Sequence, residues 1–201
     1  MARRKDHTSD ELKRLILQSA EKLIHAKGLN NLTARALAKA IGYTPGTIYN
    51  FYRDMDAVVG DINYTTLGRL PAFCEERMKK RPADFSRVRA LAYAYVDFAH
   101  DNVRAWETLY SNTRKGDRKT RLPQHYQDRL VELFDLIEKT LQECLKVPVV
   151  HSRATARLLW ACLHGITVLT LDGRLSLAGV ERPHDMIDNL LANYLAAYLK
   201  S

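Results

Sequence analysis

The sequence predicts an all-α protein in two parts, an N-terminal three-helix bundle with a helix-turn-helix and a larger helical domain. Only six prolines and nine glycines interrupt its 201 residues, and apolar residues recur at helical spacing. No run of alternating apolar and polar residues is bounded by turn signals, as a strand would be. We expect the first part at 1–53, a connecting helix at about 54–80 and the second part at 81–201.

The first helix is expected from Ser9 to Lys27. Thr8 and Glu11 have the spacing of a capping box at its start, and Gly28 follows its last residue, where glycine commonly ends a helix. These signals are local, so they predict both ends of the helix.

Two short helices follow, separated by a turn that contains Gly42. The first is expected from Thr33 to Ala40, and the second begins at Pro45 with Thr44 as its cap. Two helices joined in this way form a helix-turn-helix, whose second helix commonly lies in the major groove of DNA. The later helices are expected at about 54–80, 84–102, 104–112, 121–146, 152–171 and 184–199, with loops at 113–120 and 172–183.

The charge is concentrated near the N-terminus. The formal net charge is +8, and residues 1–53 contribute +6 of it, with ten Lys and Arg against four Asp and Glu. A basic surface favours an anionic partner, so nucleic acid, an anionic membrane and an acidic protein all fit, as does a surface that is merely soluble.

Cysteine usage and the N-terminus indicate a cytoplasmic protein. Cys74, Cys144 and Cys162 are too few and too scattered for a disulfide framework. The chain turns polar and acidic where a signal peptide would become apolar, and no stretch approaches ~18 uninterrupted apolar residues. We therefore expect no membrane partner.

The second short helix carries side chains that suit DNA. Thr44, Thr47, Tyr49 and Asn50 can form hydrogen bonds with phosphates or base edges. Glycine inside a helix costs about 1 kcal/mol, so Gly46 makes sense where a large partner approaches the backbone. Alternatively Tyr49, Phe51 and Tyr52 form a core seam; we assign Tyr49 to DNA and Tyr52 to packing, and leave Phe51 undecided.

The segment LTARALAKAIGYTPGTIYNFYRDMDAVV resembles the DNA-binding domain of TetR-family transcriptional regulators, and the resemblance covers about residues 9–60. It rests on Leu32-Thr33, Leu37-Ala38, Ile41-Gly42, Gly46-Thr47-Ile48-Tyr49 and Tyr52. The resemblance implies double-stranded DNA as a partner. The positions that match common DNA contacts are Thr33, Arg35, Thr44, Pro45, Gly46, Thr47, Tyr49 and Asn50.

The chain departs from the family pattern at two places. Phe51-Tyr52 stands where the family often has His-Phe, and Met55 stands where it often has a phosphate-binding lysine. Arg53 and the basic leader Arg3-Arg4-Lys5 are candidates to replace that contact.

In the second part, Trp160, His164 and Gly165 resemble the Trp-x-x-x-His-Gly signature of one TetR subgroup. His164 can be a core or interface residue, an effector contact or, as the least favoured reading, a metal ligand. The resemblance implies an unknown small-molecule effector, for which we select Tyr93, Trp106, Tyr110, Phe134 and His164.

The last two helices have broad apolar faces, and pairs from two chains could form a four-helix interface. Relatives of this kind dimerise in this way. We select Leu158, Leu159, Ile166, Leu190, Leu191 and Tyr194.

These features favour a ligand-responsive DNA-binding regulator: a homodimeric repressor that binds a palindromic operator and is released by its effector. We assign no catalytic residue, cofactor or metal, because phosphate-loop, dinucleotide, metalloprotease and CxxC motifs are missing from the sequence. An enzyme whose site forms only in three dimensions is one alternative. A helical module for an acidic protein or a membrane surface is another, but it does not account for Gly42 and Gly46.

Overall fold

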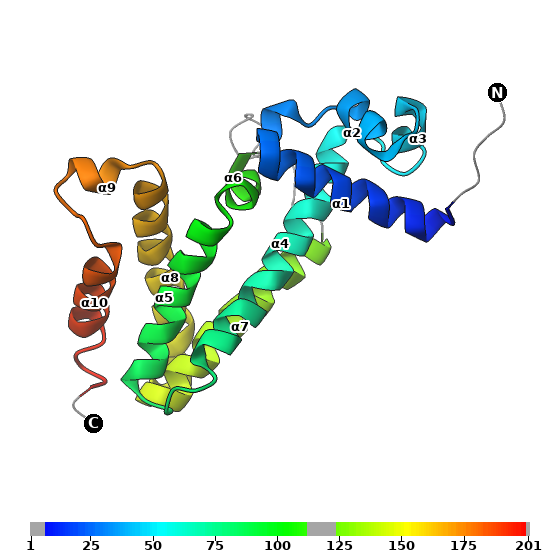
Figure 1. Ribbon diagram of the computed structural model, residues 1–201. Coiled ribbons are helices and arrows are strands. Elements are labelled where there is room, and N and C mark those ends of the chain that lie inside the picture. Colours follow the sequence, from blue (N-terminus) through cyan, green and yellow to red (C-terminus); the bar gives the residue numbers. More distant parts are fainter. Residues whose placement is uncertain (1–6, 112–123, 200–201) are drawn as a thin grey trace. The chain divides into compact units, whose positions relative to one another are not determined.

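The computed structural model describes residues 7–111 and 124–199, without the side chains of Tyr110, Ser111, Gln124 and His125. These ranges form helices and turns and contain no strand, so the all-α prediction is confirmed (Figure 1). The chain divides into two compact units. The first unit holds the residues up to 66 and those from 104 to 121, and the second holds 67–103 and the residues from 122 onward.

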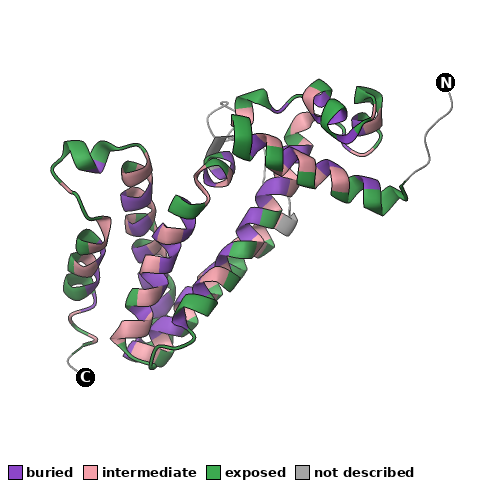
Figure 2. Cartoon of the chain, viewed as in Figure 1, coloured by how far each residue is buried: buried purple, intermediate pink, exposed green. Residues whose placement is uncertain are grey.

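The helices of the first unit pack around an apolar core. Its helices are α1 (Ser9–Lys27), the short 3₁₀ helix η1 (Leu29–Asn31), α2 (Ala34–Ile41), α3 (Pro45–Tyr49), the beginning of α4 (Met55–Met78) and most of α6 (Val103–Ser111). Helix α1 packs on α2, and α2 packs on α3. The core they share includes Ile16, Leu37, Ile48 and Val58, none of which is exposed (Figure 2).

The predicted ends of α1 are confirmed. Thr8 and Glu11 form the capping box, in which the Thr8 side chain accepts from the Glu11 amide and the Glu11 carboxylate accepts from the Thr8 amide. That amide hydrogen bond lowers the pKa of Glu11. Gly28 ends the helix with a φ of +76°, a conformation that favours glycine.

Helix α6 joins the first unit through a buried polar pair. The Asn63 amide nitrogen of α4 donates to the Thr108 carbonyl over 3.1 Å, and the Thr108 hydroxyl lies 2.7 Å from the Asn63 side-chain oxygen. Both side chains are buried, so each satisfies polar atoms that water cannot reach. The segment that begins at Arg104 lies within the predicted second part, 81–201, yet groups with the first unit.

The second unit is a bundle of long helices. It contains the end of α4, then α5 (Phe85–Asp101), α7 (Gln124–Leu145), α8 (Val149–Leu171), α9 (Arg174–Leu177) and α10 (Pro183–Tyr194). Helices α5, α7 and α8 pack on one another, and α10 packs against α5 and α8. Pro71 lies inside α4, where it has no amide hydrogen to donate to the carbonyl one turn earlier.

The largest differences from the predicted elements lie at α8, α9 and α10. Helix α8 starts at Val149 instead of Ser152, because Pro148 precedes its first turn and the Ser152 amide already donates to the Pro148 carbonyl. Helix α9 lies in a stretch predicted as loop and is flanked by two glycines with positive φ. Helix α10 ends at Tyr194 because Leu195 leaves the helical conformation, with its side chain fully buried.

Candidate functional site

The turn between α2 and α3 has the predicted glycine geometry. Gly42 adopts φ +76° and ψ 26°, the left-handed conformation. The Tyr43 amide donates to the Ala38 carbonyl over 2.9 Å, and the Gly42 amide donates to the Lys39 carbonyl over 3.4 Å. This pair of bonds is a Schellman motif, which fixes the angle at which the chain leaves α2.

Helix α3 is anchored by one side chain and is otherwise at the surface. Ile48 is fully buried in the core of the first unit. Thr44 occupies the N-cap position and Pro45 the first turn, but the Thr44 side chain makes no capping hydrogen bond. Its hydroxyl lies 3.3 Å from that of Thr47, so the cap predicted for Thr44 forms through its backbone alone.

The residues predicted to contact DNA lie at the surface of the first unit. Seven are exposed and Thr47 is half-buried, and Tyr49 has 51% of its surface accessible. All eight belong to α2, α3 and their caps, namely Thr33, Arg35, Thr44, Pro45, Gly46, Thr47, Tyr49 and Asn50.

Gly46 is not required by the packing of the chain itself. A Cβ added there would meet only the Thr44 hydroxyl, at 3.9 Å, and Gly46 is not among the glycines with positive φ. Since glycine costs about 1 kcal/mol in a helix, its presence at an exposed and unstrained position favours an outside partner that approaches the backbone.

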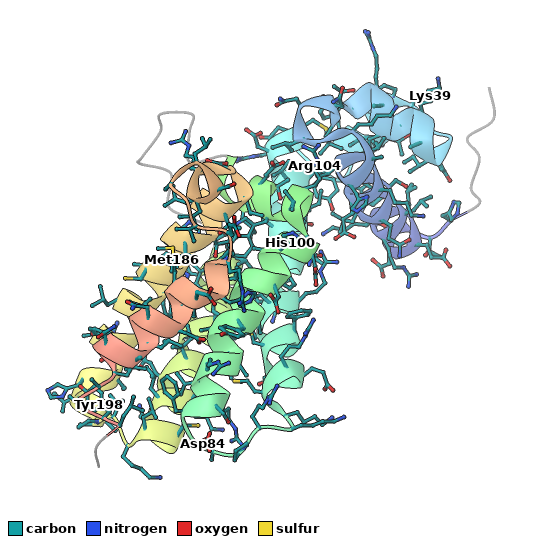
Figure 3. All side chains as sticks on the ribbon, turned by 60° about the vertical axis from the view of Figure 1, so that its left-hand side comes forward. Lys39, Asp84, His100, Arg104, Met186 and Tyr198 are labelled. Carbon is teal, nitrogen blue, oxygen red and sulfur yellow. The ribbon has the colours of Figure 1, made fainter. Side chains whose placement is uncertain are left out.

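Helix α2 adds polar groups next to α3. The Thr33 hydroxyl oxygen accepts from the Ala36 amide over 3.1 Å, which leaves its O–H able to donate outward. Arg35 is exposed in the first turn of α2. Lys39, labelled in Figure 3, is exposed one turn later. Helix α2, which packs on α3, therefore exposes two cations.

The aromatic residues after α3 pack inward. Phe51, which we left undecided, is half-buried against the core, and Tyr52 is 5% exposed. The Tyr52 hydroxyl donates to Oδ2 of Asp61 over 3.0 Å. Burial, together with the negative charge of Asp61, raises the pKa of Tyr52 well above its usual range, so the hydroxyl keeps the proton that it donates.

Met55, which stands where the family pattern often has lysine, lies at the start of α4. Met55 is half-buried and packs against the core of the first unit. Asp54 caps α4 through a 2.7 Å bond from the Ala57 amide and pairs with Arg53 at 2.9 Å. Arg53 is 84% exposed, so its remaining N–H groups face solvent.

The leader Arg3-Arg4-Lys5 lies outside the described residues, but nearby His7 contacts the Tyr43 hydroxyl at 2.9 Å.

The residues predicted to bind an effector lie in different places. Trp106 is buried in the first unit, and the side chain of Tyr110 lies outside the described residues. On α5, Tyr93 contacts the His184 ring of α10 at 4.2 Å between centroids. Phe134 contacts Trp160 at 5.5 Å, and His164 stacks on Trp160 at 5.6 Å.

The second unit contains a cavity of about 30 Å³ between α4, α5, α7, α8 and α10. Tyr95 and Trp160 line it, and the Tyr95 hydroxyl lies 3.3 Å from Nδ1 of His164. Burial lowers the pKa of His164, which favours the neutral ring. Of the five predicted residues, Phe134 and His164 therefore lie next to residues of the cavity wall. Trp160, the first residue of the Trp-x-x-x-His-Gly pattern, and Tyr95 line the cavity although neither is among the five residues selected from the sequence.

The residues predicted for a dimer interface fall into two groups. Leu159, Ile166 and Leu191 are buried in the core of the second unit itself. Leu158 is 47% exposed, Tyr194 is 37% exposed and Leu190 is half-buried. Only these three could contact another molecule directly.

Other apolar residues extend this exposed group. We define the outer apolar face as Leu158, Cys162, Gly165 and Leu169 of α8 with Met186, Leu190 and Tyr194 of α10; Met186 is labelled in Figure 3. The four α8 residues have 4-3-4 spacing, which places them on one side of the helix. A Cβ at Gly165 would meet nothing within 4 Å, so a second helix could approach α8 closely there.

Helix α8 is unusually apolar. Among the described residues, it is the one helix long and apolar enough by length and composition to cross a membrane, a test that core helices of water-soluble proteins also pass. Only 33% of its most apolar window is buried within the chain. Leu158 and Leu169, the α8 leucines of the outer apolar face, are among its exposed apolar residues.

Comparison with family models identifies both parts of the chain. Residues 16–62 match the model described as bacterial regulatory proteins, tetR family. Residues 88–194 match the model described as tetracyclin repressor-like, C-terminal domain. The second match covers more than half of the 201 residues.

Individual proteins give the same picture. The chain is 26% identical over 180 residues to the HTH-type transcriptional regulator YobS of Bacillus subtilis (strain 168), a match that covers 88% of this chain and 85% of YobS. A protein of unknown function from Rhodococcus sp. RHA1 has a similar fold, with a TM-score of 0.73, 22% identity, and 99% and 98% of the two chains covered. The TetR family regulator PfmR from Thermus thermophilus gives a TM-score of 0.59 at 17% identity, over 92% and 97% of the two chains.

Proposed function

Because the chain belongs to the TetR family of DNA-binding transcriptional regulators, we propose that it is a repressor that binds a palindromic operator as a homodimer and is released by a small molecule. A regulator of this kind meets its DNA in the bacterial cytoplasm. The family is not enzymatic, which accords with a sequence in which we found no catalytic motif.

The observation that carries the proposal is the exposed surface of α3 around Gly46. Thr44, Tyr49 and Asn50 project from a short helix that a single buried residue, Ile48, holds on the core. Their hydroxyl and amide groups can bind base edges in the major groove and phosphates beside it. Pro45 and Gly46 carry little side chain, which allows the DNA to approach the backbone.

The surrounding residues position the helix. Thr33 and Arg35 bind backbone phosphates at the start of α2, and the half-buried Thr47 supports Thr44. Phosphate contacts fix the orientation of the protein without reading sequence. The exposed guanidinium of Arg53 takes over the contact that the lysine makes in the family pattern.

The outer apolar face supports the homodimer. A helix-turn-helix this small makes few contacts with DNA, and a two-fold dimer reads two half-sites about 34–36 Å apart. Leu158, Leu190 and Tyr194 lie in this interface, and Gly165 lets the two α8 helices approach each other. Leu159, Ile166 and Leu191 support it from the core beneath.

The effector binds in the second unit and prefers one of two arrangements of the dimer. To change the ratio of the two arrangements from 99:1 to 1:99, the effector must bind the favoured arrangement more tightly by about 5.5 kcal/mol. The signal passes along α4, a single helix whose residues belong to both units.

A DNA-binding assay tests the proposal. The purified protein is mixed with fragments of the whole genome, including the region upstream of its own gene, and bound fragments are enriched and tested by mobility shift. We expect specific binding that weakens steeply between 50 and 200 mM salt, by roughly 10³-fold if about six phosphates are contacted. Absence of specific binding to any genomic fragment would contradict the proposal.

Point variants locate the contact. Asn50→Ala should lose about fivefold or more in affinity with its helical circular dichroism unchanged, because a bidentate base contact contributes about 1–3 kcal/mol. Asn30→Ala is the matched control, since Asn30 lies at the surface of the first unit but outside the proposed contact set. Equal losses of DNA affinity in the two variants would contradict a specific contact between Asn50 and DNA.

A further inference from the structure

The cavity of the second unit has a nearly uniform apolar wall. Nine of its thirteen lining residues are Ala, Val, Leu or Ile, contributed by α5, α7, α8 and α10. Among the residues that the structure describes, none that lines the cavity is Asp, Glu, Lys or Arg. The remaining four are Cys74, Tyr95, Thr140 and Trp160.

The polar groups of these four residues are neutral. Burial raises the pKa of the Cys74 thiol to about 12, so the thiol remains protonated. The Thr140 hydroxyl donates to the Leu136 carbonyl over 2.7 Å, and the Tyr95 hydroxyl lies 3.3 Å from the neutral ring of His164. The wall therefore offers hydrogen-bonding atoms but no charge to pair with a charged ligand.

This chemistry restricts what can bind. An ion that enters an apolar cavity without a partner of opposite charge loses its hydration and gains little in return. An uncharged apolar molecule instead leaves water for a surface like itself. The cavity wall therefore favours uncharged ligands over charged ones.

The size of the cavity sets a second restriction. A volume of about 30 Å³ is enough for one or two water molecules, whereas apolar cavities near 150 Å³ are known to take up benzene. Any organic ligand must therefore widen the cavity. A compact ligand needs the smallest displacement of the helices around it.

We propose that the effector is a compact, uncharged and largely apolar molecule, of the size of a single aromatic ring, that binds in this cavity beside Tyr95 and Trp160 and displaces α4 at Cys74. This inference rests on the proposed function, because it names the class of ligand that would release the repressor. Helix α4 also carries Asp61 of the first unit, so its displacement acts on the hydrogen bond to Tyr52.

Three compounds of one size and different charge test the ligand class. Benzyl alcohol, benzoate and benzylammonium are titrated into the full-length protein at pH 7.5, and binding is followed by ligand-detected NMR. We expect benzyl alcohol to bind at least tenfold more tightly than either ion. Tighter or equal binding of benzoate or benzylammonium, or no binding of the alcohol, would overturn the proposal.

Two leucines on one helix test the location. Leu141 lines the cavity and Leu145, one turn later on α7, does not, yet both are buried. Leu141→Ala should enlarge the cavity and tighten benzyl alcohol binding at least fivefold, while Leu145→Ala should leave it unchanged. Equal behaviour of the two variants would place the ligand elsewhere.

A cavity-filling variant covers the case in which Leu141→Ala does not fold. Ala92→Val adds two methyl groups at a buried position of the wall and should weaken benzyl alcohol binding at least fivefold. Unchanged binding in this variant would overturn the location.

DNA binding is measured in the same samples, so the two proposals fail separately. Benzyl alcohol should weaken operator binding by the protein but not by Ala92→Val. If the protein binds its operator and benzoate, instead of benzyl alcohol, weakens that binding, the proposed ligand class is wrong and the proposed repressor function is retained. If it binds benzyl alcohol in the cavity but never DNA, the cavity assignment stands and the proposed function is wrong.

Discussion

The hydroxyl of Tyr52 donates a hydrogen bond to Oδ2 of Asp61, with 3.0 Å between the two oxygens. Nζ of Lys13 lies 3.4 Å from the same carboxylate oxygen and 5.6 Å from the centre of the Tyr52 ring. Residues from α1, from the segment after α3 and from α4 therefore meet at one carboxylate. A shift of α4 would act directly on Tyr52, the buried residue that follows α3.

We expect Tyr52→Phe to lower the free energy of unfolding by about 1–2 kcal/mol, because it removes this bond and leaves part of the carboxylate without its donor. Urea denaturation measures the change. Tyr49→Phe is the control, since Tyr49 is 51% exposed and its replacement should stay within about 0.5 kcal/mol. If both variants are equally stable, the bond to Asp61 contributes nothing to the fold.

Gly46→Ala and Gly60→Ala form a matched pair. Neither glycine has positive φ, and an added Cβ has room at both positions, so each change should stabilise its helix by up to about 1 kcal/mol. Only Gly46→Ala should lose DNA affinity, by about tenfold or more, because its methyl group stands where the proposed DNA backbone passes. Fluorescence anisotropy with labelled operator measures the affinity. Unchanged binding by Gly46→Ala would remove the argument that Gly46 makes room for DNA.

Leu169→Arg should convert the proposed dimer into a monomer. Leu169 is 40% exposed on the outer apolar face, and a charge there would be buried against its two-fold copy without a partner. Leu177→Arg is the control, because Leu177 is 89% exposed on α9, outside that face. Analytical ultracentrifugation at micromolar concentration distinguishes the states. A wild-type monomer, or two variants of identical mass, would contradict the interface.

His164 should make the protein less stable in mild acid. Burial lowers its pKa in the folded chain, while the unfolded chain titrates near the usual value of about 6.5. Below that pH the unfolded state takes up a proton that the folded state does not, so the free energy of unfolding falls as the pH decreases. His164→Gln should lose less stability between pH 7.5 and 5.5 than the wild type. An NMR titration that gives His164 a pKa above 6.5 would refute this.

Helix ends were predictable where the signal is local. Thr8 with Glu11, Gly28 and Gly42 each act on the backbone within one turn, so the bounds of α1 and α2 were predicted to within one residue. The end of α10 was missed because Leu195 leaves the helix and is buried in the core, which depends on residues far away in the sequence.

The cavity and the outer apolar face could not be read from the sequence, because both depend on how a helix is rotated. Tyr93 and Tyr95 are two positions apart, so they lie on nearly opposite sides of α5, and only Tyr95 lines the cavity. Leu158 and Leu159 are neighbours in sequence, yet one is exposed and the other buried. Composition alone does not decide which member of such a pair turns inward.

The chain passes from one unit to the other more than once, because the segment that begins at Arg104 returns to the first unit after α5. Thr108 on this returning segment supplies the partner of Asn63, so a fragment that ends at Thr66 would leave a buried amide without its bonds. The first unit, which carries the helix-turn-helix, is therefore encoded in two separate stretches of the sequence. Exchanging the first unit between two regulators, in the laboratory or during evolution, would therefore require both stretches to be exchanged together. Otherwise the residues at 63 and 108 would come from different proteins and would still have to form their hydrogen bonds.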